Sequence, residues 1–270
     1  MIPDPLIRYG LEFNPFLKNS RDDTLIETSE FKEALFRLNY LASTKGFGLL
    51  TGAPGLGKTT VIRHFTASLN PSLFKVCYSA MSTLTVMEFY RSLVDQLGLI
   101  PSYRKTDNFK IIQTEISRLA LEKRITPVFI IDEANYVSNA ILNDLKMLFN
   151  FDMDSRDRAV VLLSGLPVLN HTLSLNIHEP FRQRIIMNYN LDVLSKDEGR
   201  SYILKKLSGA GCSQKVFEDN AIEAILNASG GVPRVINKLC ASCLLIGANQ
   251  GLNILSVDTA MQAISDTVLG

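Results

Sequence analysis

The sequence predicts an α/β protein in which a parallel sheet flanked by helices is followed by a small all-helical domain. Three observations support this class. Short apolar runs of strand length alternate with amphipathic segments of helical length, as in a parallel sheet with helices on both faces. The first apolar run ends in a glycine-rich turn that leads into a helix. After residue 191 only helical patterns follow, so the architecture changes there.

The individual elements follow from local periodicity and stop signals. Apolar residues within 29–44 recur every three or four positions, as on one face of a helix. Asn70 and Pro71 end the helix that begins at Lys58. Strands are expected at 47–51, 74–78, 127–131, 160–164 and 185–191. Helices are expected at 29–44, 58–69, 85–97, 108–123, 139–149, 196–207, 220–228, 232–248 and 257–267.

These elements predict three parts of the chain. Residues 1–45 are expected to form an N-terminal segment and helix that pack on the core of the domain that follows. Residues 46–193 form the α/β nucleotide-binding domain, and residues 194–270 form a helical lid domain. The nucleotide-binding assignment depends on the motifs described below.

Composition excludes some function classes. A chain of 270 residues that is 46% hydrophobic can bury a large core. Its net charge of +1 excludes a commitment of the whole molecule to nucleic acid or anionic lipid, although a local basic patch stays open. No apolar run approaches the roughly 20 residues that a membrane-spanning helix needs. The N-terminal residues lack the pattern of a signal peptide, so we expect a soluble, cytoplasmic protein without a membrane partner.

Cysteine usage indicates no disulfide framework. The four cysteines include a C-x-x-C pair, Cys240 and Cys243, within an apolar helical pattern. A structural zinc site usually needs four ligands, and no second pair of cysteines is present. A buried structural pair is favoured, and a redox or metal role is the alternative.

Residues 52–59 match the phosphate-loop pattern G-x-x-x-x-G-K-[ST]. The glycines let the backbone fold so that N–H groups point at phosphate oxygens. Lys58 supplies charge for the β- and γ-phosphates, and the Thr59 hydroxyl is a ligand for Mg²⁺. The preceding strand and following helix make a chance glycine-rich turn the weaker alternative. We expect ATP to contact Gly52, Ala53, Pro54, Gly55, Leu56, Gly57, Lys58, Thr59 and Thr60.

A second candidate motif is the apolar strand that ends in Asp132 and Glu133. Asp132 is expected to hold Mg²⁺ opposite Thr59, and Glu133 to act as general base for the attacking water. The alternative is that the two acids only cap the next helix. Ser164 ends the following strand, where it can contact the γ-phosphate or the water, or simply end the strand.

Three arginines are candidates for contact with the nucleotide. Arg234 begins a helix of the second domain, and Arg182 and Arg184 lie near the end of the first. Guanidinium is permanently charged and forks onto phosphate oxygens, which suits a catalytic finger supplied to a neighbouring subunit. A surface or structural ion pair is the alternative for each of them.

Several segments together resemble the ExeA-type branch of AAA+ ATPases. They are Tyr9–Phe16, Gly46–Gly52, Asp132–Ala134, Phe181–Ile185, Tyr202–Ile203, Ala210–Gly211 and Gly230–Asn237, and they span nearly the whole chain. The resemblance implies sensor 1 near Ser164–Leu166, an arginine finger at Arg182 or Arg184, and sensor 2 at Arg234. Leu166 and Asn135 stand where the family often has Gln. Because the Leu166 side chain cannot hydrogen-bond a phosphate, Ser164 is the better candidate for the sensor 1 role. Hydrolysis is therefore expected to be slow.

The branch includes a secretion-assembly ATPase and standalone transposition helpers of the TnsC/TniB kind. The secretion members continue into a membrane span, whereas this sequence stops after the lid, which favours the helper. The resemblance to such helpers implies homo-oligomeric rings or helical filaments, with ATP at the subunit interfaces. They assemble on duplex DNA without sequence preference and recruit or regulate a transposase, with a target-selection protein as a further partner. The alternative is a cytosolic ATPase that assembles a secretion or envelope complex.

DNA contact is expected in a basic segment between residues 101 and 124. It contains six basic and three acidic side chains, and an aromatic residue stands beside two of the bases. Such side chains suit the phosphate backbone without reading sequence. The candidates are Tyr103, Arg104, Lys105 and Lys110, and a solvated helix face is the alternative.

Overall fold

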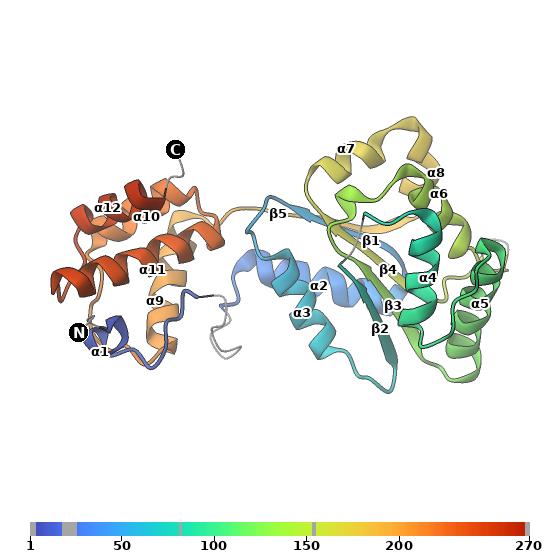
Figure 1. Cartoon of the computed structure of the whole chain (residues 1–270), viewed down its shortest axis with the longest axis horizontal. Coiled ribbons are helices and arrows are strands. Elements are labelled where there is room, and N and C mark those ends of the chain that lie inside the picture. The colour runs from blue at the N-terminus through green and yellow to red at the C-terminus, as the bar shows by residue number, and fades with distance from the viewer. Residues whose placement is uncertain (1–3, 18–25, 81–82, 153–154, 268–270) are drawn as a thin grey trace. The chain divides into compact units, whose positions relative to one another are not determined.

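The structure is a computed structural model that describes residues 4–17, 26–80, 83–152 and 155–267 (Figure 1). The chain divides into two compact units. The helical unit comprises Met1–Lys32, Gly55–Gly57 and Asp192–Gly270. The sheet unit comprises Glu33–Pro54 and Lys58–Leu191.

The sheet unit contains five parallel strands in the order β2-β3-β4-β1-β5. The strands are β1 (Gly46–Gly52), β2 (Phe74–Ser79), β3 (Thr126–Ile131), β4 (Val160–Gly165) and β5 (Ile185–Leu191). All residues of β1 and β4 are buried, which explains their continuous apolar runs. The predicted fold class is confirmed.

Helices lie on both sides of this sheet in Figure 1. They are α2 (Ser29–Thr44), α3 (Lys58–Ser68), α4 (Val86–Gln96), α5 (Lys105–Ser117), α6 (Asn139–Leu148), α7 (Val168–Ser174) and α8 (Glu179–Arg182). Thr85 and Glu88 form a capping box that fixes the start of α4. A π-helical turn (Arg118–Glu122) extends α5, and 3₁₀ turns occupy Ala134–Tyr136 and Asn176–His178. The helical structure between residues 168 and 182 was not expected from the sequence.

Aromatic packing holds the centre of the sheet unit. The rings of Phe47 and Phe181 meet edge to face with centroids 4.9 Å apart, and Phe129 contacts Phe149 at 5.1 Å. Such pairs contribute roughly 0.5–1.5 kcal/mol beyond the area they bury. This packing ties α8 and α6 to the strands that carry the candidate site.

The helical unit contains α1 (Pro5–Tyr9), α9 (Lys196–Gly209), α10 (Asp219–Ser229), α11 (Pro233–Gln250) and α12 (Val257–Thr267). Cys240 and Cys243 lie fully buried on α11, and burial raises the pKa of Cys243 to about 12. They pack as small apolar side chains in the core of this unit.

The N-terminal segment differs from the expectation for residues 1–45. Tyr9, Leu11 and Phe16 are buried in the core of the helical unit and not on the ATPase sheet. The ammonium of Lys206 on α9 is also buried, and it donates to the Pro15 carbonyl at 2.7 Å. Burial lowers the pKa of Lys206 to about 8. The described N-terminal residues 4–17 therefore belong to the helical unit.

No helix among the described residues combines the length and apolar character needed to cross a bilayer.

Candidate active site

The phosphate loop connects β1 to α3 at the carboxyl edge of the sheet. Gly55 and Gly57 have φ angles of 87° and 99°, a region that glycine enters without strain. Lys58 is buried, and its ammonium donates to the carbonyls of Gly52 at 2.7 Å and Ala53 at 3.2 Å. The loop thus curls around its own lysine. The loop leads directly into the N-terminus of α3, the positive end of the helix dipole, which suits an anion.

Residues 55–57 of the phosphate loop are part of the helical unit, and Gly55 lies close to Arg234 of that unit. A Cβ atom at Gly55 would lie 2.8 Å from the Arg234 Cβ. The Arg234 backbone N–H donates to the Gly55 carbonyl at 3.2 Å. Arg234 stands in the first turn of α11, directly after Pro233. Glycine at position 55 therefore satisfies two constraints, the positive φ and the close approach.

Asp132 is the centre of a hydrogen-bond network just beyond the end of β3. Its Oδ1 accepts from the Ser164 hydroxyl at 2.8 Å and from the Glu133 N–H at 3.0 Å. Its Oδ2 accepts from the Tyr78 hydroxyl at 3.0 Å and from the Thr59 hydroxyl at 3.2 Å. The carboxylate is 4% exposed. The strand order that places β3 between β2 and β4 brings these groups together.

Tyr78 was not singled out by the sequence. It lies near the end of the edge strand β2, in register with Ile130 of β3. Burial raises the pKa of Tyr78 to about 12, and the neighbouring Asp132 carboxylate acts in the same direction. The phenol therefore remains a hydrogen-bond donor across the physiological pH range.

The donor set fits Mg²⁺. Thr59 and Asp132 offer oxygen atoms only, which is the chemistry this ion prefers, and Ser164 adds a second hydroxyl oxygen beside them. No group of three or more His, Cys, Asp and Glu side chains suited to a metal occurs in the part of the chain that the structure describes. One carboxylate and one hydroxyl suffice where nucleotide phosphates and water complete the ligands, as is usual for this ion.

Glu133 occupies a strained position. Its φ of 52° and ψ of 36° lie in the left-handed region, which costs a non-glycine residue about 1–3 kcal/mol. The side chain is exposed, whereas the neighbouring Asp132 is buried. The α6 helix is capped by Ser138, whose hydroxyl accepts from the Ile141 N–H. The helix-capping alternative for the two acids is therefore wrong, and the backbone strain favours a functional role.

Ser164 and Asn135 connect the end of β4 to the acidic turn. Ser164 is fully buried against Asp132, so its contact is with that carboxylate. The side-chain oxygen of Asn135 accepts from the Leu166 N–H at 3.0 Å. A Cβ atom at Gly165 would lie 2.8 Å from this oxygen. Leu166 stands at the expected sensor position. Its backbone N–H bonds the Asn135 side chain, which holds the residues after β4 in place.

A second polar chain crosses the same edge of the sheet. The Asn170 amide donates to the Thr51 hydroxyl at 2.8 Å, and Thr51 donates to the Asn190 side-chain oxygen at 3.0 Å. Thr51 is fully buried directly before the phosphate loop. These hydrogen bonds join α7, β1 and β5. They can be recognised only once the strand order is known.

The two candidate finger arginines differ in their surroundings. Arg184 is partly buried, donates to the Lys146 carbonyl at 2.6 Å and lies 5.5 Å from the Phe47 ring centroid. Arg182 ends α8, is exposed, and donates to the Ser174 carbonyl at 2.8 Å. Arg184 is thus packed into its own unit, whereas the guanidinium of Arg182 lies at the surface.

The candidate DNA-binding residues also divide. Tyr103 is 90% exposed and stands directly before α5, where Arg104 is the exposed N-cap residue. Lys110 is exposed on the same helix. Lys105 forms an ion pair of 2.6 Å with the buried Asp144, which gives it a structural partner inside its own unit.

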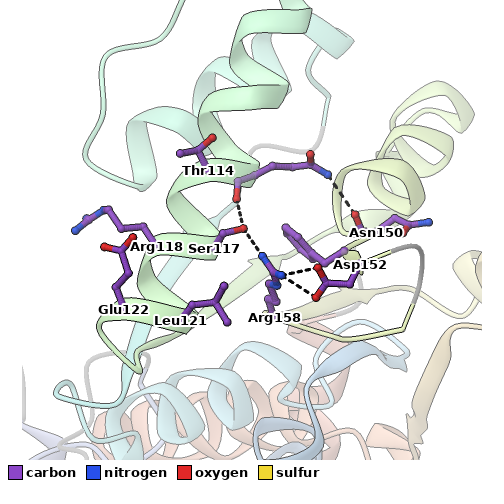
Figure 2. A pocket seen from close by; sticks show the side chains of 10 residues that line it. Thr114, Ser117, Arg118, Leu121, Glu122, Asn150, Asp152 and Arg158 are labelled. Atoms are coloured by element: carbon purple, nitrogen blue, oxygen red, sulfur yellow. Dashed lines mark hydrogen bonds and ion pairs between the residues drawn. The ribbon is translucent and has the colours of Figure 1, made fainter.

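A separate pocket of about 520 Å³ lies near the opposite, amino-terminal edge of the sheet. Figure 2 shows Arg158 pointing at Asp152 and Ser117 across it. Each of these contacts measures 2.7 Å. Arg158 stands shortly before β4 begins, far along the strand from Ser164 at its carboxyl end. The pocket is therefore not part of the candidate nucleotide site.

Comparison with known proteins agrees with this geometry. A family described as AAA domain matches residues 41–173. Cdc6p from Pyrobaculum aerophilum superposes with a TM-score of 0.73 at 13% identity, over 95% of this chain and 71% of that one. The ORC1 protein of Aeropyrum pernix, solved in complex with DNA, gives a TM-score of 0.66 at 14% identity, over 93% and 68%. The chain therefore contains an AAA domain and has the P-loop AAA+ fold.

The sequence is also 32% identical over 249 residues to General secretion pathway protein A of Aeromonas hydrophila. The match covers 90% of this chain and 45% of the relative. The chain thus spans less than half the length of that protein.

Proposed function

We propose that this protein binds Mg²⁺–ATP at the phosphate loop and hydrolyses it slowly, in oligomers that assemble a secretion or envelope complex. One observation carries the proposal. Thr59 and Ser164 both donate hydrogen bonds to Asp132, beside a phosphate loop that already encloses Lys58. Phosphoryl transfer needs positioning and charge neutralisation more than covalent chemistry, so these groups are sufficient.

The proposed roles follow from the contacts. Lys58 exchanges its loop carbonyls for phosphate oxygens, because a charge-assisted bond to phosphate is stronger than one to a neutral carbonyl. Mg²⁺ neutralises phosphate charge when bound, with Thr59 and Asp132 as its protein ligands. Glu133 reaches solvent beside Asp132, where it orients the attacking water and accepts its proton. Asn135 holds the Leu166 N–H at the end of the neighbouring strand.

Arg182 is the preferred candidate for a finger acting on a neighbouring subunit. Each arginine donates to a backbone carbonyl, but Arg182 is exposed at the end of α8, whereas Arg184 is partly buried and also lies near the Phe47 ring. Arg234 is proposed as sensor 2, because its backbone contacts Gly55 of the phosphate loop. The finger assignment makes hydrolysis depend on nucleotide-driven assembly.

The biological role is inferred from the relative. General secretion pathway protein A matches 90% of this chain, and its name concerns secretion. We therefore propose a cytoplasmic ATPase that acts on protein partners during assembly of such a system. This reverses the preference drawn from the sequence, where the transposition helper ranked first.

The second candidate is the DNA-assembled transposition helper. Exposed Tyr103, Arg104 and Lys110 favour it, because an aromatic ring among cations suits a phosphate backbone. A protein of the same fold, ORC1, was solved with DNA. In this case duplex DNA, a transposase and a target-selection protein would be the partners.

Sedimentation of the full chain with a non-hydrolysable ATP analogue and Mg²⁺, with and without duplex DNA, separates the two. The first proposal predicts oligomers that form equally well without DNA. Assembly that requires DNA and weakens steeply with salt would contradict it and support the helper. Tyr103→Ala with Arg104→Ala is the matched variant, and only the helper predicts that it loses assembly.

A further inference from the structure

Tyr78 makes a contact that the proposed mechanism does not use. Its hydroxyl donates to the Asp132 Oδ2 at 3.0 Å from the neighbouring strand β2. The residue lies on the edge strand and is 44% exposed. Here it bonds the acidic residue of the candidate metal site.

Both oxygens of the Asp132 carboxylate accept hydrogen bonds. An ionised carboxylate offers about four lone-pair positions. Ser164, Glu133, Tyr78 and Thr59 supply four donors, two to each oxygen. These bonds fix both the position and the rotation of the carboxylate.

The donors are not equivalent in the metal-bound state. Thr59 is itself a proposed ligand, so its hydroxyl oxygen must face the ion and its bond to Oδ2 cannot be relied on to orient Asp132. Ser164 and the Glu133 N–H hold Oδ1. Tyr78 donates to Oδ2 and comes from outside the set of ligands. Groups that orient a metal ligand in this way typically change metal affinity 10- to 100-fold when they are removed.

We infer that Tyr78 is a positioning residue for Mg²⁺, which orients Asp132 by a hydrogen bond from the end of the adjacent strand. This inference rests on the proposed binding of Mg²⁺–ATP. It assigns β2 a part in the site, although the sequence motifs of the site lie on β1, β3 and β4.

The test is the Mg²⁺ dependence of nucleotide binding, measured with a fluorescent ATP analogue and the full chain. Tyr78→Phe removes the hydroxyl and keeps the ring. We expect the Mg²⁺ concentration at half-saturation to rise about 10- to 100-fold. Nucleotide affinity in EDTA should equal that of the wild type, and so should the melting temperature in EDTA. Tyr40→Phe, which removes a half-exposed hydroxyl on α2, is the matched control and should leave all three values unchanged.

A direct readout uses Mn²⁺ in place of Mg²⁺, with bound and free ion distinguished by electron paramagnetic resonance. Tyr78→Phe should release Mn²⁺ at lower chelator concentration than Tyr40→Phe. Equal metal affinity in the two variants would overturn the inference, as would an equal loss of nucleotide affinity with and without metal. If wild-type nucleotide binding is indifferent to Mg²⁺, the proposed metal site itself fails, which is a different result.

Discussion

Replacement of Arg184 tests whether this side chain is structural. Arg184→Ala removes a hydrogen bond of 2.6 Å to the Lys146 carbonyl and a guanidinium 5.5 Å from the Phe47 ring centroid. A hydrogen bond from a charged donor contributes about 1.5–3 kcal/mol, and an exposed cation–π contact about 0.5–1 kcal/mol. Because Arg184 is only partly buried, we expect a loss near the lower end, about 2 kcal/mol.

A loss of this size should lower the melting temperature by about 4–8 °C for a domain of this length. Arg182→Ala removes a hydrogen bond to the Ser174 carbonyl that is exposed to solvent, so it should lower the melting temperature less than Arg184→Ala does. It should instead lower ATP turnover about 10³-fold at protein concentrations where oligomers form. Differential scanning calorimetry and ATPase assays over a concentration series measure both effects. The assignment of Arg182 as the finger is contradicted if Arg184→Ala keeps the wild-type melting temperature and abolishes concentration-dependent turnover, while Arg182→Ala keeps that turnover.

Three further predictions concern the site and the helical unit. Glu133→Gln should bind ATP with unchanged affinity while single-turnover hydrolysis falls at least 100-fold; unchanged hydrolysis would exclude the general-base role. Asn135→Ala leaves the Leu166 N–H without its 3.0 Å partner, so we expect kcat to fall about 10-fold with little change in nucleotide affinity, and a change confined to affinity would be inconsistent with this. Burial lowers the pKa of Lys206 from 10.5 to about 8, so the unfolded chain binds the proton more tightly. The free energy of unfolding should therefore rise with pH between about 8 and 10.5, and chemical denaturation of Lys206→Met should lose this slope.

Local sequence patterns predicted the sheet well. Hydrophobic periodicity and stop signals depend on neighbouring residues, and the structure places β2 at Phe74–Ser79 and β3 at Thr126–Ile131, within one residue of the expectation. The phosphate loop and the acidic strand end were also found, because each motif is contiguous in sequence. Both lie at the carboxyl edge, as a parallel sheet requires.

Contacts between distant segments were not predictable in the same way. Tyr78 reaches Asp132 only because β2 lies beside β3, and Asn170 reaches Thr51 only because of how α7 follows β4. The burial of Tyr9 in the helical unit joins segments more than 200 residues apart, such as Tyr9 and Cys212. Strand order and long-range packing carry no local signal, and the short helices between residues 168 and 182 have too few turns to show periodicity.

Isothermal titration calorimetry of the intact protein with ATP and Mg²⁺ tests the central claim most directly. We predict saturable binding of one nucleotide per chain, and loss of that heat in Lys58→Ala, whose buried ammonium is replaced by a methyl group. A folded wild-type protein that takes up no adenine nucleotide in the presence of Mg²⁺ would contradict the account.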